Sequence, residues 1–544
     1  MNRTLLPPTE SLLPRAPRPA RLWPLWLILI GGLIAVAVVR LNPGSTFQDR
    51  NLRSLLIAVI TGVLCLLWWL FLSRLPWKTR GLGLLAVVGA LVIGKGLFRI
   101  RGVSGDLLPI LEPRWISPPV LPTAAAATNA LPARANTQDA PARADFPQYL
   151  GPSRDTTIAG LVLNPDWAAH PPQVLWRIPV GAAWSGFVIV GNRAITQEQR
   201  GDDEWVTCRD LATGRMLWEH ADPAKYDTVI AGTGPRQTPV VVADRVFTMG
   251  ATGVINCLEL ATGRRLWGTN LLTLAQRDSE VKGGVPGQRT NLARIPDWGY
   301  AGTPLVVDDK VIVQPGGDGG RSLVAFNATT GALVWNVGDE SGDYSSPTLL
   351  TLAGVRQVLI FSSRQISAHD PATGRLLWQH PFGTHYPLVA NPLAVGPDRV
   401  LLSAGYGVGA ELLDIKPGTN GSLTATTVWS SRRLKAKFHH PVRRGDFAYA
   451  LDDGIWACLD LKDGSQPWKS GRYGHGQGLL VGEHYLLMAE NGELVLLQPT
   501  PEAPHELSKF RIFDRKTWNP PALSGEFLLV RNDEEAVLLK LALK

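Results

Sequence analysis

Cysteine, methionine and charged residues are all scarce in this sequence of 544 residues, which has 4 Cys, 4 Met and only 18% Asp, Glu, Lys and Arg. So few cysteines exclude a disulfide-rich scaffold. Cys208, Cys257 and Cys458 recur at matching places in separate repeats, too far apart for a bond that needs Cα atoms within about 7 Å. We therefore expect three small buried thiols. The low charge, beside 45% hydrophobic residues, excludes a disordered chain and suggests membrane segments.

Acidic residues are nearly absent from the first 101 residues, which hold 2 Asp or Glu against 13 Lys or Arg. This segment has a net charge of +11, so the +8 of the whole chain leaves −3 for the remainder. A slightly acidic main domain is poorly suited to neutralise phosphates, and we predict no nucleic-acid partner. The basic residues flank apolar runs instead, where they set membrane topology.

Three apolar runs open the chain, at Leu22–Val39, Ser54–Leu72 and Gly81–Phe98. Each is close to the roughly 20 helical residues that cross a bilayer, and none contains Asp, Glu or His. A cleaved signal peptide is the alternative for the first run, since Ala35–Ala37 is a faint cleavage signal, but two further spans favour a retained anchor. We predict a membrane anchor over residues 1–101 with three transmembrane helices.

The positive charges also give a weak preference for orientation. Four Arg precede the first run and three Lys or Arg lie between the second and third runs, seven in all, against five or six on the other side: three Arg in the first loop, Arg99 and Arg101 after the third run, and Lys95 if it snorkels. Because positive residues stay on the cytoplasmic side, this favours an inside N-terminus. Three spans then place the main domain outside. We expect a multi-pass protein of the inner (cytoplasmic) membrane with its large domain on the periplasmic or extracellular side.

Residues 102–144 are rich in proline and alanine, as in Pro118-Pro119 and Ala124–Ala127. They lack the periodicity of a strand or a helix. This composition predicts a semi-extended linker between the anchor and the main domain.

A motif recurs through residues 145–544 and decides the fold. An apolar strand ends at Asp, Glu or Asn, Thr-Gly or Asp-Gly follows, and Trp comes four residues after the Gly. Its clear copies are Cys208–Trp218, Cys257–Trp267, Ala325–Trp335, Ala368–Trp378 and Cys458–Trp468. The polar residue and Gly predict a hairpin turn, and the Trp on the outermost strand can pack between neighbouring units.

The spacing of these motifs predicts the number of blades. A looser copy ends at Trp429 and a degenerate one near Phe510, while Trp176 has a terminal-strand motif with no preceding strands. The intervals are compatible with four-stranded blades of about 40–50 residues. We therefore predict an all-β, eight-bladed β-propeller of four-stranded antiparallel blades, preceded by three transmembrane α-helices. Its last blade would be shared between the Trp176 strand and the C-terminal strands, which removes open sheet edges.

This repeat resembles the pyrroloquinoline-quinone (PQQ)-like, or quinoprotein alcohol dehydrogenase-like, β-propeller family over Asp145–Lys544, and Phe146–Asp155 resembles the lead-in segment of bacterial members. The resemblance implies a fold more than an activity, because the superfamily holds both quinoprotein dehydrogenases and a non-enzymatic lipoprotein of outer-membrane β-barrel assembly. The adjacent-Cys pair of some family enzymes is absent. The family's calcium-binding groups and catalytic Asp have no matching motif here.

Loops that lead into the innermost strand of each blade line a funnel at the axis of a propeller. The register of the repeats places aromatic, amide and basic side chains there that can stack on a planar ligand or bond its edges. We predict as candidate funnel-lining, cofactor-binding residues Trp184, Arg236, Gln237, Tyr300, Tyr344, His385, His440, His475 and Trp518. The alternative is that these side chains simply close the funnel. We predict no catalytic residue. We also predict no metal site, because adjacent His439 and His440 would point to opposite faces of a strand and would not bind one metal ion together.

An insertion at about Leu272–Asp297 is either a contact surface or an ordinary variable loop. We interpret the chain as a non-enzymatic binding or scaffold module of the cell envelope, with envelope proteins or a small planar ligand as partners. The alternative is a PQQ-dependent quinoprotein dehydrogenase that oxidises alcohols or sugars, with PQQ and calcium as cofactors.

Overall fold

The computed structural model describes residues 20–42, 45–116, 144–273, 295–317, 320–362 and 364–544. These residues separate into two units. One comprises the helices and residues 106–116, and the other comprises Arg101–Gly105 and the whole propeller. Most of the insertion predicted at about Leu272–Asp297 and of the linker predicted over 102–144 lies outside the described residues.

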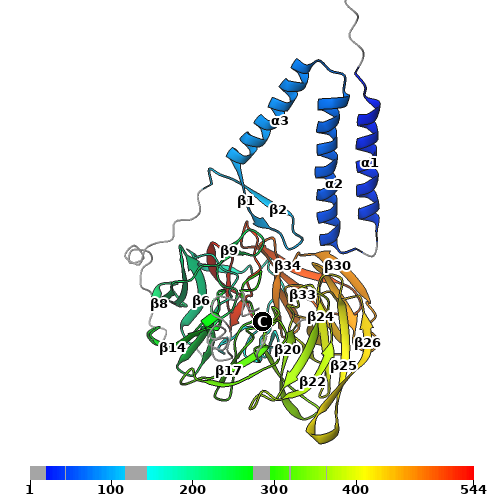
Figure 1. Cartoon of the computed structure of the whole chain (residues 1–544). Helices are drawn as coiled ribbons and strands as arrows, with labels where there is room; N and C mark the ends of the chain where they lie inside the picture. The colour runs from blue at the N-terminus through cyan, green and yellow to red at the C-terminus, as the bar shows by residue number, and fades with distance from the viewer. Residues whose placement is uncertain (1–19, 43–44, 117–143, 274–294, 318–319, 363) are drawn as a thin grey trace, which may run out of the picture. The chain divides into compact units, whose positions relative to one another are not determined.

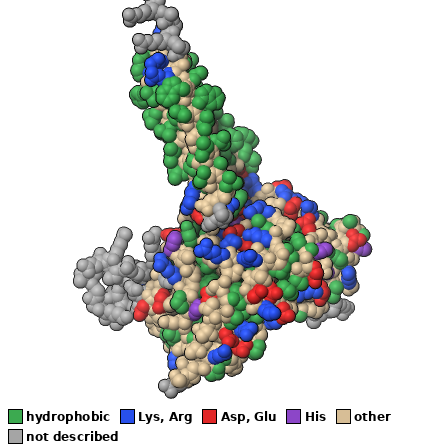
Figure 2. Space-filling model, turned by 90° about the vertical axis from the view of Figure 1, so that its right-hand side faces the viewer, with side chains coloured by type: hydrophobic (Ala, Val, Ile, Leu, Met, Phe, Trp, Pro, Cys, Tyr) green, Lys and Arg blue, Asp and Glu red, His purple; other side chains and the backbone are tan. Residues whose placement is uncertain are grey.

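The three predicted apolar runs are helices: α1 (Trp23–Leu41), α2 (Phe47–Leu67, continued by a π-helical turn, Trp68–Leu72) and α3 (Trp77–Leu97). All three are long and apolar enough to cross a membrane, and hydrophobic side chains cover their surface (Figure 2). Helix α2 begins seven residues before the predicted run. Its first turns are polar, and the Thr46 side chain caps them by accepting the Asp49 N–H at 3.1 Å.

Two short strands follow α3, β1 (Phe98–Val103) and β2 (Pro109–Pro113), and they pair with each other. The sequence predicted a linker without regular structure from residue 102 onward. The hairpin of β1 and β2 corrects this prediction for the first part of the linker. The turn between the strands contains Gly105 and Asp106, with Leu107 at a φ of 57°. A single hairpin is too short to show the repeated alternation by which strands are recognised in sequence.

The propeller has eight blades, as predicted, and they follow one another around the ring from cyan to red (Figure 1). Blades 1 to 4 are β5 (Val188–Val190), β6 (Arg193–Arg200), β7 (Asp203–Asp210), β8 (Met216–Asp222); β11 (Val240–Val242), β12 (Arg245–Met249), β13 (Val254–Glu259), β14 (Arg265–Asn270); β15 (Leu305–Val307), β16 (Lys310–Val313), β17 (Leu323–Asn327), β18 (Leu333–Val337); and β19 (Thr348–Leu352), β20 (Val355–Ser362), β21 (Gln365–His369), β22 (Leu376–Pro381).

Blades 5 to 8 complete the ring. They are β23 (Leu393–Ala394), β24 (Arg399–Ala404), β25 (Gly409–Pro417), β26 (Leu423–Ser431), with a 3-10 turn at Thr419–Gly421; β27 (Val442–Arg444), β28 (Phe447–Asp452), β29 (Ile455–Asp460), β30 (Trp468–Arg472); β31 (Gln477–Val481), β32 (His484–Met488), β33 (Glu493–Gln498), β34 (His505–Arg511); and β35 (Ala522–Ser524), β36 (Phe527–Arg531), β37 (Glu535–Lys540), β4 (Gln173–Pro179). A parallel strand, β3 (Thr157–Ile158), joins blade 7, and β9 (Asp227–Thr228) and β10 (Gly232–Thr233) form a small hairpin.

Blade 8 closes the ring in the predicted way. Strand β4, from the N-terminal side of the propeller, pairs antiparallel with the C-terminal strand β37, and Trp176 lies opposite Leu538. The largest hydrophobic core cluster lies around this closure and joins both ends of the domain. Sharing a blade between the two ends ties the ring shut by a full ladder of hydrogen bonds.

The repeated Trp bonds most blades to the next, although the indole N–H of Trp335 has no hydrogen-bond partner among the described residues. In five blades its indole N–H donates to a backbone carbonyl of the next blade's turn at 2.8–3.0 Å; the pairs are Trp176–Leu211, Trp218–Leu260, Trp267–Ala328, Trp429–Leu461 and Trp468–Thr500. Trp378 instead donates to Gln357 in its own blade at 2.5 Å. The following blade, blade 5, has a longer turn that lacks the Thr-Gly motif, so the usual carbonyl is not presented there.

The motif Gly serves the same contact. Gly263 has a φ of 72°, and a Cβ on it would lie 2.4 Å from the ring of Trp218 in the preceding blade. The Gly is therefore required both by the left-handed turn and by the indole that packs on it. This joint requirement explains why Gly and Trp recur together in the sequence.

We expect Gly263→Ala to lower the stability of the propeller clearly more than Gly396→Ala. Gly396 has a φ of 77° but nothing within 4 Å of its Cβ direction, so its substitution carries only the left-handed strain of about 1–2 kcal/mol. Gly263→Ala adds an overpacking cost of about 1–3 kcal/mol. Urea unfolding followed by Trp fluorescence measures both, and equal midpoints would contradict the inter-blade role of the Gly.

Candidate functional site

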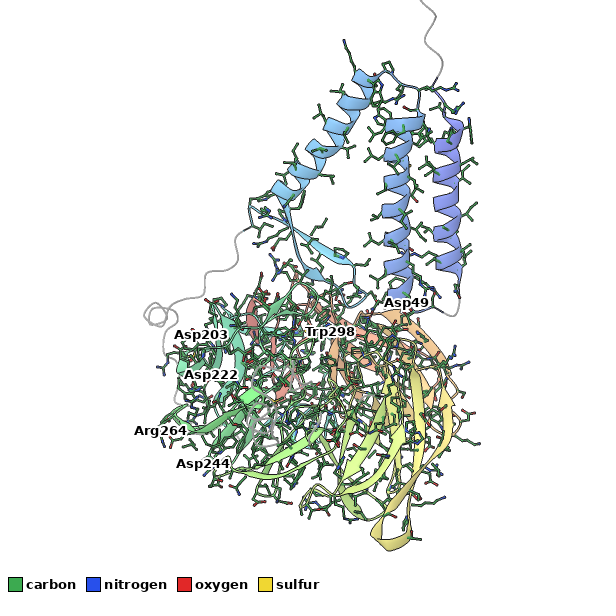
Figure 3. All side chains as sticks on the ribbon, in the orientation of Figure 1. Asp49, Asp203, Asp222, Asp244, Arg264 and Trp298 are labelled. Carbon is green, nitrogen blue, oxygen red and sulfur yellow. The ribbon has the colours of Figure 1, made fainter. Side chains whose placement is uncertain are left out.

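The loops that lead into the innermost strands lie on one face of the propeller, because the four strands of each blade alternate in direction. We call these segments the mouth loops and this face the mouth. The mouth loops are Ala183–Gly186, Pro235–Pro239, Trp298–Pro304, Asp343–Pro347, His385–Pro392, Phe438–Pro441, Gly474–Gln477 and Thr517–Pro520. Side chains fill the spaces between the ribbons of the propeller (Figure 3). Figure 3 labels one residue of the mouth loops, Trp298.

A chain of hydrogen bonds runs around the axis through these loops. In each link a backbone N–H of one blade donates to a side chain at the equivalent position of the next blade. The links from blade 1 to blade 6 are Gly186 to Thr238 (3.1 Å), Thr238 to Thr303 (3.2 Å), Thr303 to Ser346 (2.9 Å), Ser346 to Asn391 (3.0 Å) and Asn391 to His440 (2.8 Å). Asn519 links blade 8 back to blade 1 through the carbonyls of Ala183 and Ser185.

The predicted site residue His440 belongs to this chain of bonds and not to an open funnel wall. Its Nδ1 accepts the Asn391 N–H, so the ring proton lies on Nε2, which is 2.6 Å from the Tyr149 hydroxyl. Burial, reinforced by the positive charge of Arg154, lowers the pKa of His440 to about 3 and keeps it neutral. Its neighbour His439 accepts the Leu451 N–H at 2.6 Å.

The axis of the propeller is filled by Ala144–Ile158, which we call the plug. The plug bonds with blade 1 through Phe146 and Ile189, with blade 2 through Pro147 and Val241, and with blade 7 through Thr156 and Leu480. Its Arg154 is 6% exposed and donates to the carbonyls of Thr303 (2.8 Å) and Pro304 (3.0 Å). Burial lowers the pKa of Arg154 to about 10.

Three further predicted residues contact protein groups; Gln237 and Tyr300 are buried and Arg236 is half-buried. Arg236 lies over the Tyr226 ring at 4.4 Å and donates to the carbonyls of Ala231 (2.6 Å) and Gly232 (3.1 Å). Burial lowers its pKa to about 10. Gln237, fully buried, donates to the Tyr300 carbonyl. The Tyr300 ring packs in the core between blades 2 and 3, so the structure brings these residues together as a support of the mouth loops.

Trp184, Trp518 and His475 do meet at the mouth. The indoles of Trp184 and Trp518 are 4.9 Å apart, and Phe438 lies 5.2 Å from Trp518 and 5.4 Å from His475. The Lys516 ammonium stands over Trp518 at 3.7 Å and over Trp184 at 4.7 Å. Burial lowers the pKa of Lys516 to about 8. Two neighbouring indoles, tilted by 46° to each other, beneath an ammonium can hold an anionic aromatic ligand.

Tyr344 and His385 do not touch this aromatic group directly, although Tyr386, Tyr406 and Lys437 connect His385 to Phe438. Tyr344 packs edge-on against Trp298 at 5.6 Å, and exposed His385 stacks on Tyr386 at 4.2 Å. Tyr344 also lines a cavity of about 360 Å³ between blades 3 and 4 with Asp343, whose pKa is raised to about 7 by burial. The nine predicted residues therefore form one cluster of three at the mouth and several separate contacts.

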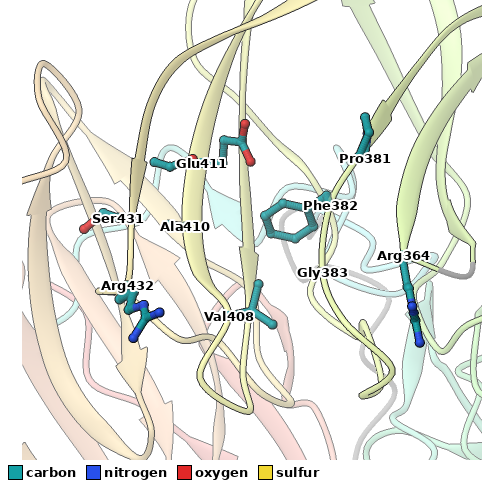
Figure 4. Close-up of a pocket in the computed structure, with 10 residues that line it drawn as sticks. Arg364, Pro381, Phe382, Gly383, Val408, Ala410, Glu411, Ser431 and Arg432 are labelled. Carbon is teal, nitrogen blue, oxygen red and sulfur yellow. The ribbon is translucent and has the colours of Figure 1, made fainter. Parts of the chain in front are cut away.

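A second hollow on the mouth face lies between blades 4 and 5. It has a volume of about 460 Å³, and Phe382 stands between Arg364 and Arg432 (Figure 4). Both arginines are exposed. Glu411, which also lines it, accepts from the Thr427 hydroxyl and pairs with His380 Nε2 at 3.0 Å. The hollow offers an aromatic floor with basic edges.

No group of three or more His, Cys, Asp or Glu that could hold a metal ion occurs among the described residues. Calcium needs 6–8 oxygen ligands. The residues at the mouth thus fit the planar, anionic part of a quinone cofactor, while the described part of the chain supplies no carboxylate cluster for its metal.

The sequence reasoning missed Lys437, Lys516 and Glu490, which also lie at the mouth, and the plug residues Tyr149 and Arg154. Lys437 and Lys516 directly flank two predicted mouth segments, so a wider window would have found them. The chain of hydrogen bonds had its own signal: a polar residue stands immediately before a proline at Thr238, Thr303, Ser346, Asn391, His440 and Asn519.

Comparison with known proteins supports the fold. A family model described as outer membrane protein assembly factor BamB matches residues 202–470. A europium-containing methanol dehydrogenase superposes with a TM-score of 0.50 at 12% identity, over 73% of this chain and 98% of that one. BamB from Moraxella catarrhalis gives a TM-score of 0.45 at 16% identity, over 68% and 97%. No curated protein matches the sequence.

Proposed function

Because this chain carries a PQQ-like β-propeller beside three helices apolar enough to span a membrane, we propose that it is a membrane-anchored binding or scaffold module of the cell envelope. The filled axis is the observation that carries this proposal. The plug occupies the centre through Tyr149 and Arg154, and the mouth loops are bonded to one another, blade to neighbouring blade, around it. A propeller built in this way presents surfaces rather than a deep reaction chamber.

The mouth face offers a surface that a protein partner can bind. Val229 and Ile230, at the tip of the β9–β10 hairpin, are 58% and 53% exposed. The hairpin is held against the mouth because the Trp184 indole donates to the Ala231 carbonyl at 2.8 Å. Two exposed β-branched residues on a fixed support resemble the apolar centre of a protein interface more than a loop that only needs to be soluble.

The location follows from the basic residues that flank the helices. Positive charges before α1 and between α2 and α3 favour a cytoplasmic N-terminus. With three spans the propeller is then on the periplasmic or extracellular side of the inner membrane, where its partners are envelope proteins.

The test places the photocrosslinking residue p-benzoylphenylalanine at position 230 of the full chain in its native membrane. We expect irradiation to give discrete covalent adducts with envelope proteins, identified by mass spectrometry. Position 334 is the control, because Val334 is 45% exposed but lies on β18, the outer strand of blade 3. Adducts that are absent at both positions, or identical at both, would contradict the proposal.

A quinoprotein dehydrogenase is the second candidate, and the grouping of Trp184, Trp518 and Lys516 favours it. The quinone would supply the redox chemistry, and these residues would bind and orient it. Loss of the adducts at position 230, together with a saturable rise in the thermal midpoint of the full chain when PQQ and calcium are added, would favour this enzyme over the scaffold.

A further inference from the structure

The mouth of the propeller holds a segment of the chain itself, Arg101–Gly105, which we call the strap. Two lysines of the propeller bind main-chain carbonyls of the strap. Lys437 Nζ donates to the Gly105 carbonyl at 2.5 Å, and Lys516 Nζ donates to the Val103 carbonyl at 2.7 Å. Lys437 is only 3% exposed. It lies 4.6 Å from the centre of the Tyr406 ring. Two ammonium groups are thus placed to bind backbone oxygens above an aromatic floor.

A carboxylate completes the contact with the main chain. Glu490 accepts the Gly105 N–H at 2.6 Å through one oxygen and the His475 N–H at 2.8 Å through the other. Gly105 thereby has both its N–H and its carbonyl bound. A Cβ on Gly105 would lie 2.1 Å from the His475 ring, so this position accepts only glycine.

The other end of the strap is recognised by charge. Arg101 pairs with Asp533 at 2.8 Å and with Glu534 at 2.6 Å, in the loop between β36 and β37. Between the two ends, Gly102 is buried and Ser104 is half-buried. The mouth therefore contacts three features of a short extended peptide: a basic side chain at the first position, a main-chain carbonyl at the third, and glycine at the fifth.

We infer that the mouth is a peptide-binding site for an extended segment with Arg at its first and Gly at its fifth position, and that the strap occupies it in cis. A partner segment of this chemistry binds when the strap leaves. Recognition through backbone groups with a few side-chain pockets is the general way in which proteins bind extended peptides. The inference rests on the proposed function, since it names the class of partner segment that the module binds.

A tethered strap competes strongly with a free peptide, because its effective concentration is in the millimolar range. The experiment therefore uses the full chain in lipid nanodiscs with the strap either intact or released. Gly105→Ala releases the strap through the clash with His475, and Arg101→Ala releases its other end without added bulk. The probe is a fluorescein-labelled peptide with the sequence Arg-Gly-Val-Ser-Gly, and fluorescence anisotropy measures its Kd.

We expect both released variants to bind the peptide at least about tenfold more tightly than the unchanged chain. A peptide that ends in Ala instead of Gly should not bind, and adding Glu490→Gln to Gly105→Ala should abolish binding to the normal peptide. Equal affinity for both peptides, or no gain in either released variant while its Trp fluorescence stays native, overturns the inference. Adducts retained at position 230 in that case leave the scaffold function standing, because Lys437, Lys516, Glu490 and the Asp533–Glu534 loop bind the strap, and the Ile230 crosslink tests none of them.

Discussion

Replacing Arg531 by Ala should lower the free energy of unfolding by about 3–5 kcal/mol, because each buried acceptor that loses its donor costs about 1–3 kcal/mol. Arg531 is 1% exposed. From blade 8 it donates to the carbonyls of Gln197 (3.0 Å) and Gly181 (2.5 Å) in and beside blade 1. Its removal leaves these buried carbonyls without their donor at the point where the ring closes.

The carboxylate of Glu198 adds to this cost. Burial alone would raise its pKa, but the positive charges of Arg200 and Arg531 outweigh burial and hold the pKa below its usual value. Without Arg531 the fully buried carboxylate keeps Arg200, which pairs with it, and Arg209 as its nearby cations, and part of its desolvation is no longer offset.

Arg177→Ala is the matched control, because it removes the same residue type from the same closing blade. Arg177 pairs with Glu535 at 2.7 Å, but the two side chains are 41% and 29% exposed. A pair of this kind contributes about 0–1 kcal/mol. Urea unfolding of both variants in detergent, followed by Trp fluorescence, gives the comparison. Similar midpoints for the two would show that the buried contact does not stabilise the closure.

The propeller could be predicted from the sequence because its decisive contacts repeat. The turn polar residue, the Gly and the Trp stand at fixed spacing, and the same packing of indole on the neighbouring Gly recurs from blade to blade. The PQQ-like resemblance and the shared eighth blade are confirmed for this reason. The pairing of β4 with β37 was predictable because the N-terminal Trp176 strand had no strands of its own blade before it, and the C-terminal strands lacked an outermost strand.

The mouth was harder to predict because its contacts join segments with no common spacing. Arg236 was predicted to line the funnel and bind a cofactor, but the loop that carries it folds back and presents its own carbonyls to the guanidinium. Tyr149 reaches His440 across 291 residues of sequence. Lys437 and Lys516 meet a segment that was interpreted as linker. Such choices depend on which chain segment is nearest in space, and no local pattern encodes that.

Glu204→Gln should remove a fall in stability that accompanies rising pH. Burial, with a smaller contribution from Asp222 directly across the strand pair, raises the pKa of Glu204 to about 7, against 4.5 for an ordinary Glu. One carboxylate oxygen accepts the Ala251 N–H at 3.0 Å, and the other has no hydrogen-bond partner among the described residues. The folded state therefore favours the protonated acid.

The sign follows from proton binding. Between pH 4.5 and about 7 the folded chain retains a proton that the unfolded chain releases, so stability falls as pH rises through this window. The contribution of the protonated Glu204 to the free energy of unfolding is fully present below pH 4.5. It is lost above about pH 7, a change of about 3 kcal/mol. Asp343, with a pKa also raised to about 7, acts in the same direction and leaves part of the slope in the variant.

Urea midpoints of the full chain in detergent at pH 4.5 and pH 8 test this. We expect Glu204→Gln to match the unchanged chain at the lower pH, where the acid and the amide are similar in shape and charge, and to be more stable at the higher pH, where the buried carboxylate is ionised beside Asp222. Glu502→Gln, at an exposed position, should follow the unchanged chain at both. If the urea midpoint of Glu204→Gln changes between the two pH values by the same amount as that of Glu502→Gln, then Glu204 is ionised in the folded state at no cost. The junction of blades 1 and 2 must then hold more water than its burial indicates.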